Sequence, residues 1–183
     1  PAGCDPSIYR EIVELAKSRG RLTAVDTSGA ALRHALEAKP DIIKPNIHEL
    51  EEYSGRTFAT MGELVGCCRV FLAQGVSLAV VSMGADGALF VSEKEALVAV
   101  APVSRVASTV GAGDAMVAGI AAGTLAKLGL EKTAAMATAF SLIAISNIEL
   151  GIREPRDVET LAGTVSIYTL SEQQEELWQK SLR

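Results

Sequence analysis

Short apolar runs alternate along this chain with longer stretches in which apolar side chains recur every three or four positions. The short runs predict buried strands and the longer stretches predict helices. Strands that alternate with helices imply a mostly parallel sheet with helices on both faces. The expected strands are 22–25, 41–43, 78–81, 88–91 and 97–100; the expected helices are 7–19, 30–36, 47–53, 61–73, one that begins near 113, and 133–145.

The ends of the first predicted helix are marked by residues that favour such positions. Asp5-Pro6 precedes the helix and Gly20 follows it, as expected for a start and a stop. Its apolar residues Ile8, Ile12, Leu15 and Ala16 share one face. At the other end of the chain, residues 171–183 are polar and rich in Glu and Gln. We therefore expect a folded region over 1–170 and a peripheral helix or tail over 171–183.

Composition excludes several classes of protein. With 183 residues, 49% of them hydrophobic, the chain can bury one full core. A net charge of −5 and an aromatic content of 4% argue against nucleic-acid binding. The apolar stretches are too short for a membrane span of about 20 residues. Three cysteines without zinc-site spacing fit a reducing cytoplasm, and no zinc site is expected.

A glycine-rich loop, Gly111-Ala112-Gly113-Asp114, precedes an apolar helix. Glycines let the backbone turn tightly, and the free N–H groups at a helix start favour an anion such as phosphate. Asp114 either caps the helix or has a chemical task, such as accepting a proton from a hydroxyl group. Local physics leaves the two roles open. A dinucleotide fingerprint is excluded because Met116 stands at its third glycine, and no Walker A triplet occurs in the chain.

The polar residues Lys44, Asn46 and Glu49, after the second predicted strand, can have a structural or a functional role. Asn46 and Glu49 have the spacing of a helix capping box, which Thr60 and Glu63 repeat. On local grounds capping is favoured, and Lys44 is a surface lysine at the end of a strand.

Two further segments predict turns at strand ends. Ser82-Met83-Gly84 follows an apolar strand, and Gly87 lets the chain return into a hairpin. Asp26 is the first residue of the turn Asp26-Thr27-Ser28-Gly29. A role in binding a metal ion and a purely structural role in this turn are equally favoured for Asp26.

Four segments in this order resemble the motifs of the ribokinase-like (PfkB) family of carbohydrate kinases. They are Asp26–Gly29, Lys44–Leu50, Ser82–Gly87 and Thr109–Asp114. The resemblance extends from the first residue to about residue 170. It implies a three-layer α/β/α fold, of which this sequence would be the C-terminal portion. The N-terminal part, with the first strands, most of the sugar site and a β lid, would be missing.

The resemblance also implies roles for individual residues. Asp114 would be the catalytic base, and the loop formed by Gly111, Ala112 and Gly113 would hold the transferring phosphoryl group. Glu49 and Asp26 would bind Mg²⁺, partly through water. The residues expected to bind ATP are Lys44, Asn46, Glu49, Ser82, Gly84, Gly87 and Asn147.

Potassium activation stays open at this point. Many family members have an aspartate before the threonine of the glycine motif, where it helps to bind K⁺, and this chain has Ser108 instead. Backbone carbonyl groups of Ser108 and Val110 remain candidate ligands for K⁺. His48 and Arg153 are expected to be surface residues.

The activity implied by the resemblance is that of an ATP-dependent sugar-phosphate kinase. The likeness points to fructose 1-phosphate as acceptor and fructose 1,6-bisphosphate as product, with fructose 6-phosphate or tagatose 6-phosphate as alternative acceptors. A non-catalytic nucleotide-binding or scaffold module is the alternative from another class. The complete enzyme is expected to be a homodimer, and residues 1–183 alone are expected to be inactive.

Overall fold

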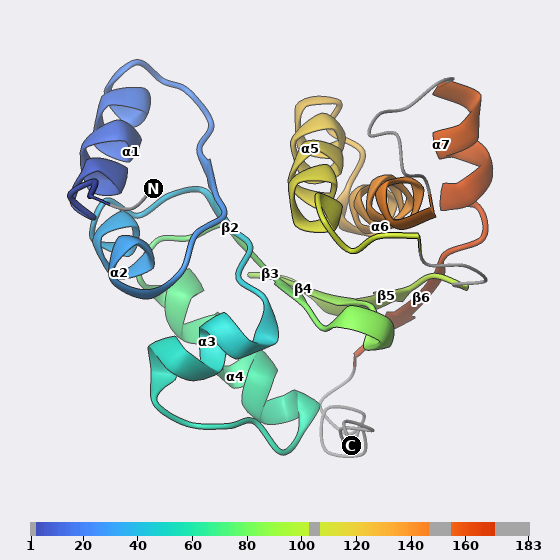
Figure 1. The fold of residues 1–183 in the computed structure, drawn as a ribbon, viewed down its shortest axis with the longest axis horizontal. Helices are drawn as coiled ribbons and strands as arrows, with labels where there is room; N and C mark the ends of the chain where they lie inside the picture. The colour runs from blue at the N-terminus through green and yellow to red at the C-terminus, as the bar shows by residue number, and fades with distance from the viewer. Residues whose placement is uncertain (1–2, 103–106, 147–154, 171–183) are drawn as a thin grey trace. The chain divides into compact units, whose positions relative to one another are not determined.

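The computed structural model describes residues 3–102, 107–146 and 155–170 (Figure 1). Within these residues the chain is an α/β protein with seven α-helices and a mixed sheet of six strands. It divides into two compact units, unit 1 (1–81, 91–96 and 170–183) and unit 2 (82–90 and 97–169). The elements are α1 (Ile8–Ser18), β1 (Ala24–Val25), α2 (Gly29–Glu37), β2 (Ile42–Ile43), α3 (Ile47–Ser54), α4 (Met61–Ala73), β3 (Leu78–Ser82), the 3-10 turn η1 (Gly84–Asp86), β4 (Ala88–Ser92), β5 (Ala96–Val100), α5 (Ala112–Leu125), α6 (Leu130–Ser146), α7 (Pro155–Ala162) and β6 (Ser166–Thr169).

The predicted elements are present, with two differences. The first predicted strand began at Leu22, but β1 starts at Ala24 and the side chain of Leu22 is 46% exposed. The prediction that Leu22 is a buried strand residue is therefore wrong. The other difference is that α7 and β6 were not expected from the sequence. The apolar residues of α7, Val158, Leu161 and Ala162, cover only about one turn, which is too short a period to predict a helix. β6 is mostly exposed and therefore has no apolar run that predicts a strand.

In unit 1, three parallel strand segments lie side by side and helices cover them. Val25 of β1 lies opposite Ile43 of β2, and Ile43 lies opposite Ala79 of β3. Val13 of α1 and Ala35 of α2 pack with Val25. Since parallel strands end at the same edge of a sheet, the residues that follow β1 and β2 are neighbours.

In unit 2, α5 and α6 pack so closely that side chains are excluded from part of their interface. A Cβ atom on Gly119 of α5 would lie 2.5 Å from the Cα atom of Ala137 in α6. Ala139 and Ile143 on α6 pack with Val158 of α7. The small residues that made α5 look like an apolar run in sequence therefore have a packing role.

Candidate functional site

An ion pair joins the residues that follow β1 and β2. Lys44 Nζ lies 3.0 Å from Asp26 Oδ2, and the two side chains are 5% and 27% exposed. The N–H group of Lys44 also donates to the Val25 carbonyl at 2.9 Å, which fixes the backbone between the strands. Lys44 is therefore not the surface lysine that local reasoning favoured. A buried ammonium needs a charged partner, and Asp26 supplies it.

The capping box predicted for α3 is present. The N–H group of Glu49 donates to Asn46 Oδ1 at 2.9 Å, and the N–H group of Asn46 donates to Glu49 Oε2 at 2.8 Å. Helix α4 has a similar start, in which Thr60 Oγ1 accepts from the N–H of Glu63 and Glu63 Oε2 accepts from Ala59. The Asn46–Glu49 pair therefore stabilises the start of α3. The second carboxylate oxygen of Glu49, Oε1, takes no part in the capping box.

The segment Ser82–Gly87 forms the turn that was predicted between β3 and β4. The N–H group of Met83 donates to the Gly87 carbonyl at 2.8 Å, which closes the turn around η1. Gly87 has φ +88°, and a Cβ atom there would collide with the carbonyl oxygen of Ala99. Glycine is thus required at this position for steric reasons, whatever it binds. Gly84 is exposed and also has a positive φ, +63°.

The loop before α5 is fastened to the end of α6. The N–H groups of Ala107 and Ser108 both donate to the Ile145 carbonyl, at 2.7 and 3.3 Å. The Ser108 hydroxyl then accepts from the N–H of Val110 at 3.1 Å. These bonds position the segment that leads into the glycine-rich loop.

The glycine-rich loop forms the N-terminus of α5. Gly111 is the N-cap residue in the left-handed conformation, with φ +81°, and its carbonyl accepts from Ala115 at 2.9 Å. The N–H of Ala112 donates to the Thr109 carbonyl over a long 3.4 Å. Among the described residues, the N–H groups of Gly113 and Asp114 have no acceptor. Free N–H groups at a helix start can donate to an anion, and the anion site predicted here stays a prediction.

Asp114 is not the helix cap. It lies in the first turn of α5, its side chain is exposed, and it makes no capping bond. No described residue pairs with its carboxylate. The capping interpretation of Asp114 is therefore wrong, since Gly111 occupies that place.

The predicted site residues fall into two sets. Asp26, Lys44, Asn46 and Glu49 belong to unit 1; Ser82, Gly84, Gly87, Ser108 and Val110–Asp114 belong to unit 2. Asn147 and Arg153 lie outside the described residues. His48 is a surface residue as expected, with a side chain that is 86% exposed and lies near Glu51.

The two carboxylates expected to bind Mg²⁺ already have other partners. Asp26 Oδ2 contacts Lys44 and Glu49 Oε2 closes the capping box, so one oxygen of each carboxylate is left for other partners. The described residues contain no group of three or more His, Cys, Asp or Glu side chains that could hold a metal ion by themselves. This donor set fits Mg²⁺, which keeps several waters and takes one or two carboxylates.

The shifted pKa values in the described residues do not mark a nucleophile. Burial raises the pKa of the Cys67 and Cys68 thiols, which favours their neutral, unreactive form. The N–H of Ser7 donates to Asp5 Oδ1 at 2.9 Å, and this bond lowers the pKa of the Asp5 carboxyl. Asp5 thus holds the turn that leads into α1, a structural task.

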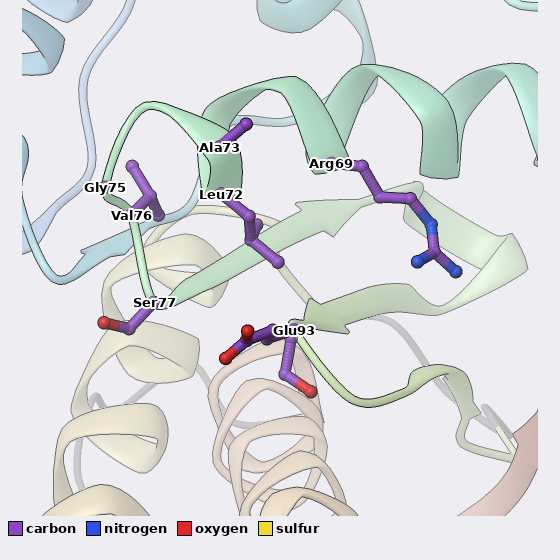
Figure 2. A pocket seen from close by; sticks show the side chains of 8 residues that line it. Arg69, Leu72, Ala73, Gly75, Val76, Ser77 and Glu93 are labelled. Carbon is purple, nitrogen blue, oxygen red and sulfur yellow. The ribbon is translucent and has the colours of Figure 1, made fainter.

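A pocket of about 540 Å³ opens elsewhere on unit 1 (Figure 2). It is lined by the end of α4, the segment before β3 and the turn after β4, including Arg69, Leu72, Val76 and Glu93. None of the predicted site residues lines it. The pocket is therefore separate from the motif residues, and the hydrogen-bonding geometry of the motifs is the better guide to function.

The chain is an α/β protein with parallel strands flanked by helices. Its polar strand ends and the glycine-rich start of α5 are typical of α/β proteins that bind phosphates at such places. The family model described as "pfkB family carbohydrate kinase" matches residues 1–156. The chain belongs to the pfkB family of carbohydrate kinases.

Individual relatives agree with this assignment. The chain is 46% identical over 170 residues to a 1-phosphofructokinase of Rhodobacter capsulatus, covering 93% of this chain and 54% of the relative. It is 33% identical to the 1-phosphofructokinase of Escherichia coli K12, covering 91% and 54%. The crystal structure of E. coli phosphofructokinase-2 in complex with potassium is similar with a TM-score of 0.81 at 27% identity, covering 89% and 53%. The chain thus spans about half the length of the relatives it matches.

Proposed function

We propose that the polypeptide containing this chain is an ATP-dependent kinase that phosphorylates fructose 1-phosphate to fructose 1,6-bisphosphate. Two findings support this: the chain belongs to a family of carbohydrate kinases, and relatives that match most of it are named 1-phosphofructokinase. The observation that carries the mechanism is the start of α5. There the exposed carboxylate of Asp114 pairs with none of the described residues. The N–H groups of Gly113 and Asp114, in the same helix turn, have no acceptor among the described residues.

In the proposed reaction, Asp114 accepts the proton of the sugar hydroxyl. The hydroxyl oxygen forms a bond to the γ-phosphorus of ATP while the bond from that phosphorus to the β-phosphate oxygen breaks, and ADP leaves. The N–H groups of Gly113 and Asp114, with the longer-bonded Ala112, hold the phosphoryl oxygens as their charge spreads. Gly111 allows this geometry because it turns the backbone at a positive φ.

Lys44 contributes positive charge near the transferring group in this proposal, and Asp26 positions it. A lysine stem is flexible, and the 3.0 Å ion pair holds its ammonium at the end of β2. Asp26 is therefore assigned first as the partner of Lys44. The nucleotide would be bound further by Asn46, Ser82, Gly84 and Gly87.

Mg²⁺ would be held by Glu49 and Asp26, largely through water, and would offset the charge of the ATP phosphates when bound. For potassium, the candidate ligands are the backbone carbonyl groups of Ser108 and Val110. The Ser108 hydroxyl accepts a hydrogen bond from the Val110 N–H group, and the carbonyl groups of Ser108 and Val110 take no part in this bond.

A coupled assay of the complete protein tests the choice of substrate. Fructose 1-phosphate, fructose 6-phosphate and tagatose 6-phosphate are compared by kcat/KM with ATP and Mg²⁺. We expect the highest value for fructose 1-phosphate. A higher value for either other sugar phosphate would change the substrate within the same family. No turnover with any sugar phosphate, together with intact ATP binding, would favour the nucleotide-binding module.

The setting proposed for this enzyme is the cytoplasm, where it would act as a homodimer. All three cysteines are free, which fits a reducing compartment. Across the described part of the chain, no helix combines the length and apolar character needed to cross a membrane.

A further inference from the structure

The pocket on unit 1 has side chains of opposite charge on its two sides. We call it the α4 pocket, and its volume is about 540 Å³. Figure 2 shows Arg69 and Leu72 on the side formed by α4, and Glu93 on the opposite side, in the turn after β4. Leu72 is half-buried and Val76 is buried. The pocket therefore combines apolar surface with a cation on one side and an anion on the other.

The α4 pocket lies away from the polar strand ends of the same unit. Gly75, Val76 and Ser77 line the pocket and precede β3, whereas Asp26 and Lys44 follow β1 and β2. Because β1, β2 and β3 are parallel, these two groups of residues lie at opposite edges of the strands. An occupant of the α4 pocket is therefore distinct from a ligand of Asp26 and Lys44.

The described part of the chain reaches Leu170 close to this pocket. The N–H group of Leu170 donates to the Ala96 carbonyl at 2.8 Å. Ala96 follows Glu95, whose carbonyl accepts from the N–H of Ser92 at 2.9 Å, and Ser92 lines the pocket. A chain extends by about 3.3 Å per residue, so the five residues after Leu170 can cross a pocket of this size. Residues 171–183 are thus within reach of the α4 pocket.

The sequence after Leu170 carries charges that complement the two sides of the pocket. The acidic pair Glu175-Glu176 precedes the apolar pair Leu177-Trp178, and Lys180 follows. Trp178 is the only tryptophan in the sequence. A tryptophan side chain buries a large apolar area, which favours its removal from water.

We propose that residues 175–180 of this same chain occupy the α4 pocket. The apolar pair of the segment covers Leu72 and Val76, its glutamates face Arg69, and its lysine faces Glu93. A guanidinium group has five N–H donors, so Arg69 can bind a carboxylate of the segment in addition to other partners. The segment thereby fastens the chain after β6 to α4 and to the turn after β4.

The emission of Trp178 tests this docking in the complete protein. Subtracting the spectrum of the Trp178→Phe variant isolates the signal of Trp178 from that of any other tryptophan. We expect emission shifted to the blue and acrylamide quenching severalfold weaker than in the urea-unfolded protein, because the side chain is covered. This readout does not depend on the proposed kinase activity.

Charge reversal tests the assigned partners. Arg69→Glu should shift the emission of Trp178 towards the unfolded value, because like charges then face each other. Glu175→Lys combined with Glu176→Lys should have the same effect. Joining all three substitutions should restore the blue-shifted emission, since the charges are then exchanged between the two sides.

Arg21→Glu is the matched control, because Arg21 is an exposed arginine of the same unit that does not line the pocket. It should leave the emission unchanged. Circular dichroism and the thermal midpoint verify that each variant folds. A solvent-exposed Trp178 in the unaltered protein, or a buried Trp178 that does not respond to Arg69→Glu, would overturn the proposal. So would a blue shift that disappears on dilution together with a dimer, because the occupant would then come from a second copy.

Discussion

At the scale of single residues, the roles expected for Asp26 and Lys44 differ most from what the structure shows. The resemblance assigned Lys44 to ATP binding and Asp26 to a Mg²⁺ site as separate residues, and local reasoning favoured a surface role for Lys44 and left a turn role open for Asp26. The structure joins them in one ion pair in which Lys44 is buried and Asp26 is half-buried. Their pairing could have been inferred, because each follows one of two strands expected to lie side by side and parallel. The burial of Lys44 could not, since it depends on packing by residues distant in sequence.

Removing either partner of this pair should have unequal effects on stability. Asp26→Asn leaves an ammonium that is 5% exposed without its counter-charge, and should lower the free energy of unfolding by about 2–4 kcal/mol. Lys44→Met leaves a carboxylate that is 27% exposed and keeps the apolar stem, so its cost should be about 1 kcal/mol. Urea denaturation followed by circular dichroism measures both. Equal costs would show that the burial of Lys44 does not govern the energetics.

At the scale of elements, periodicity and turn residues were sufficient to predict most helices and the β4–β5 hairpin. α4 spans Met61–Ala73 as predicted, because Thr60 caps its start and an apolar face follows. Two features could not be predicted from the local sequence pattern. The apolar period of α1 was evident, but the pattern could not say that Ile8, Ile12 and Leu15 would be exposed. The close approach of α5 and α6 depends on which small residues face each other, and composition alone does not fix that.

Two glycine substitutions should have opposite effects, because Gly119 lies in the close α5–α6 contact and Gly66 does not. Gly119→Ala should destabilise the protein by about 1–3 kcal/mol, because its Cβ atom would lie 2.5 Å from the Ala137 backbone. Gly66→Ala, within α4 and with open space around its Cβ position, should stabilise by about 0.5–1 kcal/mol. Thermal or urea unfolding of both variants measures the difference. A neutral Gly119→Ala would contradict the close helix packing.

Glu49 and Glu63 lie at the starts of α3 and α4 and make similar capping bonds. Substituting each of them therefore distinguishes a capping role from metal binding. Glu49→Gln keeps an amide oxygen that can accept from the Asn46 N–H, so stability should change by less than about 0.5 kcal/mol. In the complete protein the same change should raise the Mg²⁺ concentration needed for half-maximal rate, because a carboxylate ligand is lost. Glu63→Gln at the start of α4 is the control and should affect neither quantity. An unchanged Mg²⁺ requirement in Glu49→Gln would restrict Glu49 to capping.

At the scale of the whole molecule, membership of the pfkB family explains why the chain carries several motifs in the order that the family resemblance predicts. The chain matches the pfkB model over residues 1–156 yet spans about half the length of its relatives. The glycine-rich loop, the capping box and the strand-end ion pair are each built locally within one unit. Residues that would choose between sugar phosphates were not identifiable from the sequence. The complete polypeptide is accordingly the form in which the activity should be measured.

The central claim is that the start of α5 is a phosphoryl-transfer centre with Asp114 as base. Its most direct test is Asp114→Asn in the complete protein, with kcat for fructose 1-phosphate and the affinity for ATP measured side by side. Asp114 is exposed and caps nothing, so the variant should fold normally. We expect kcat to fall by about 10²–10⁴-fold with ATP affinity nearly unchanged. A kcat within a few-fold of the unaltered protein would contradict the claim.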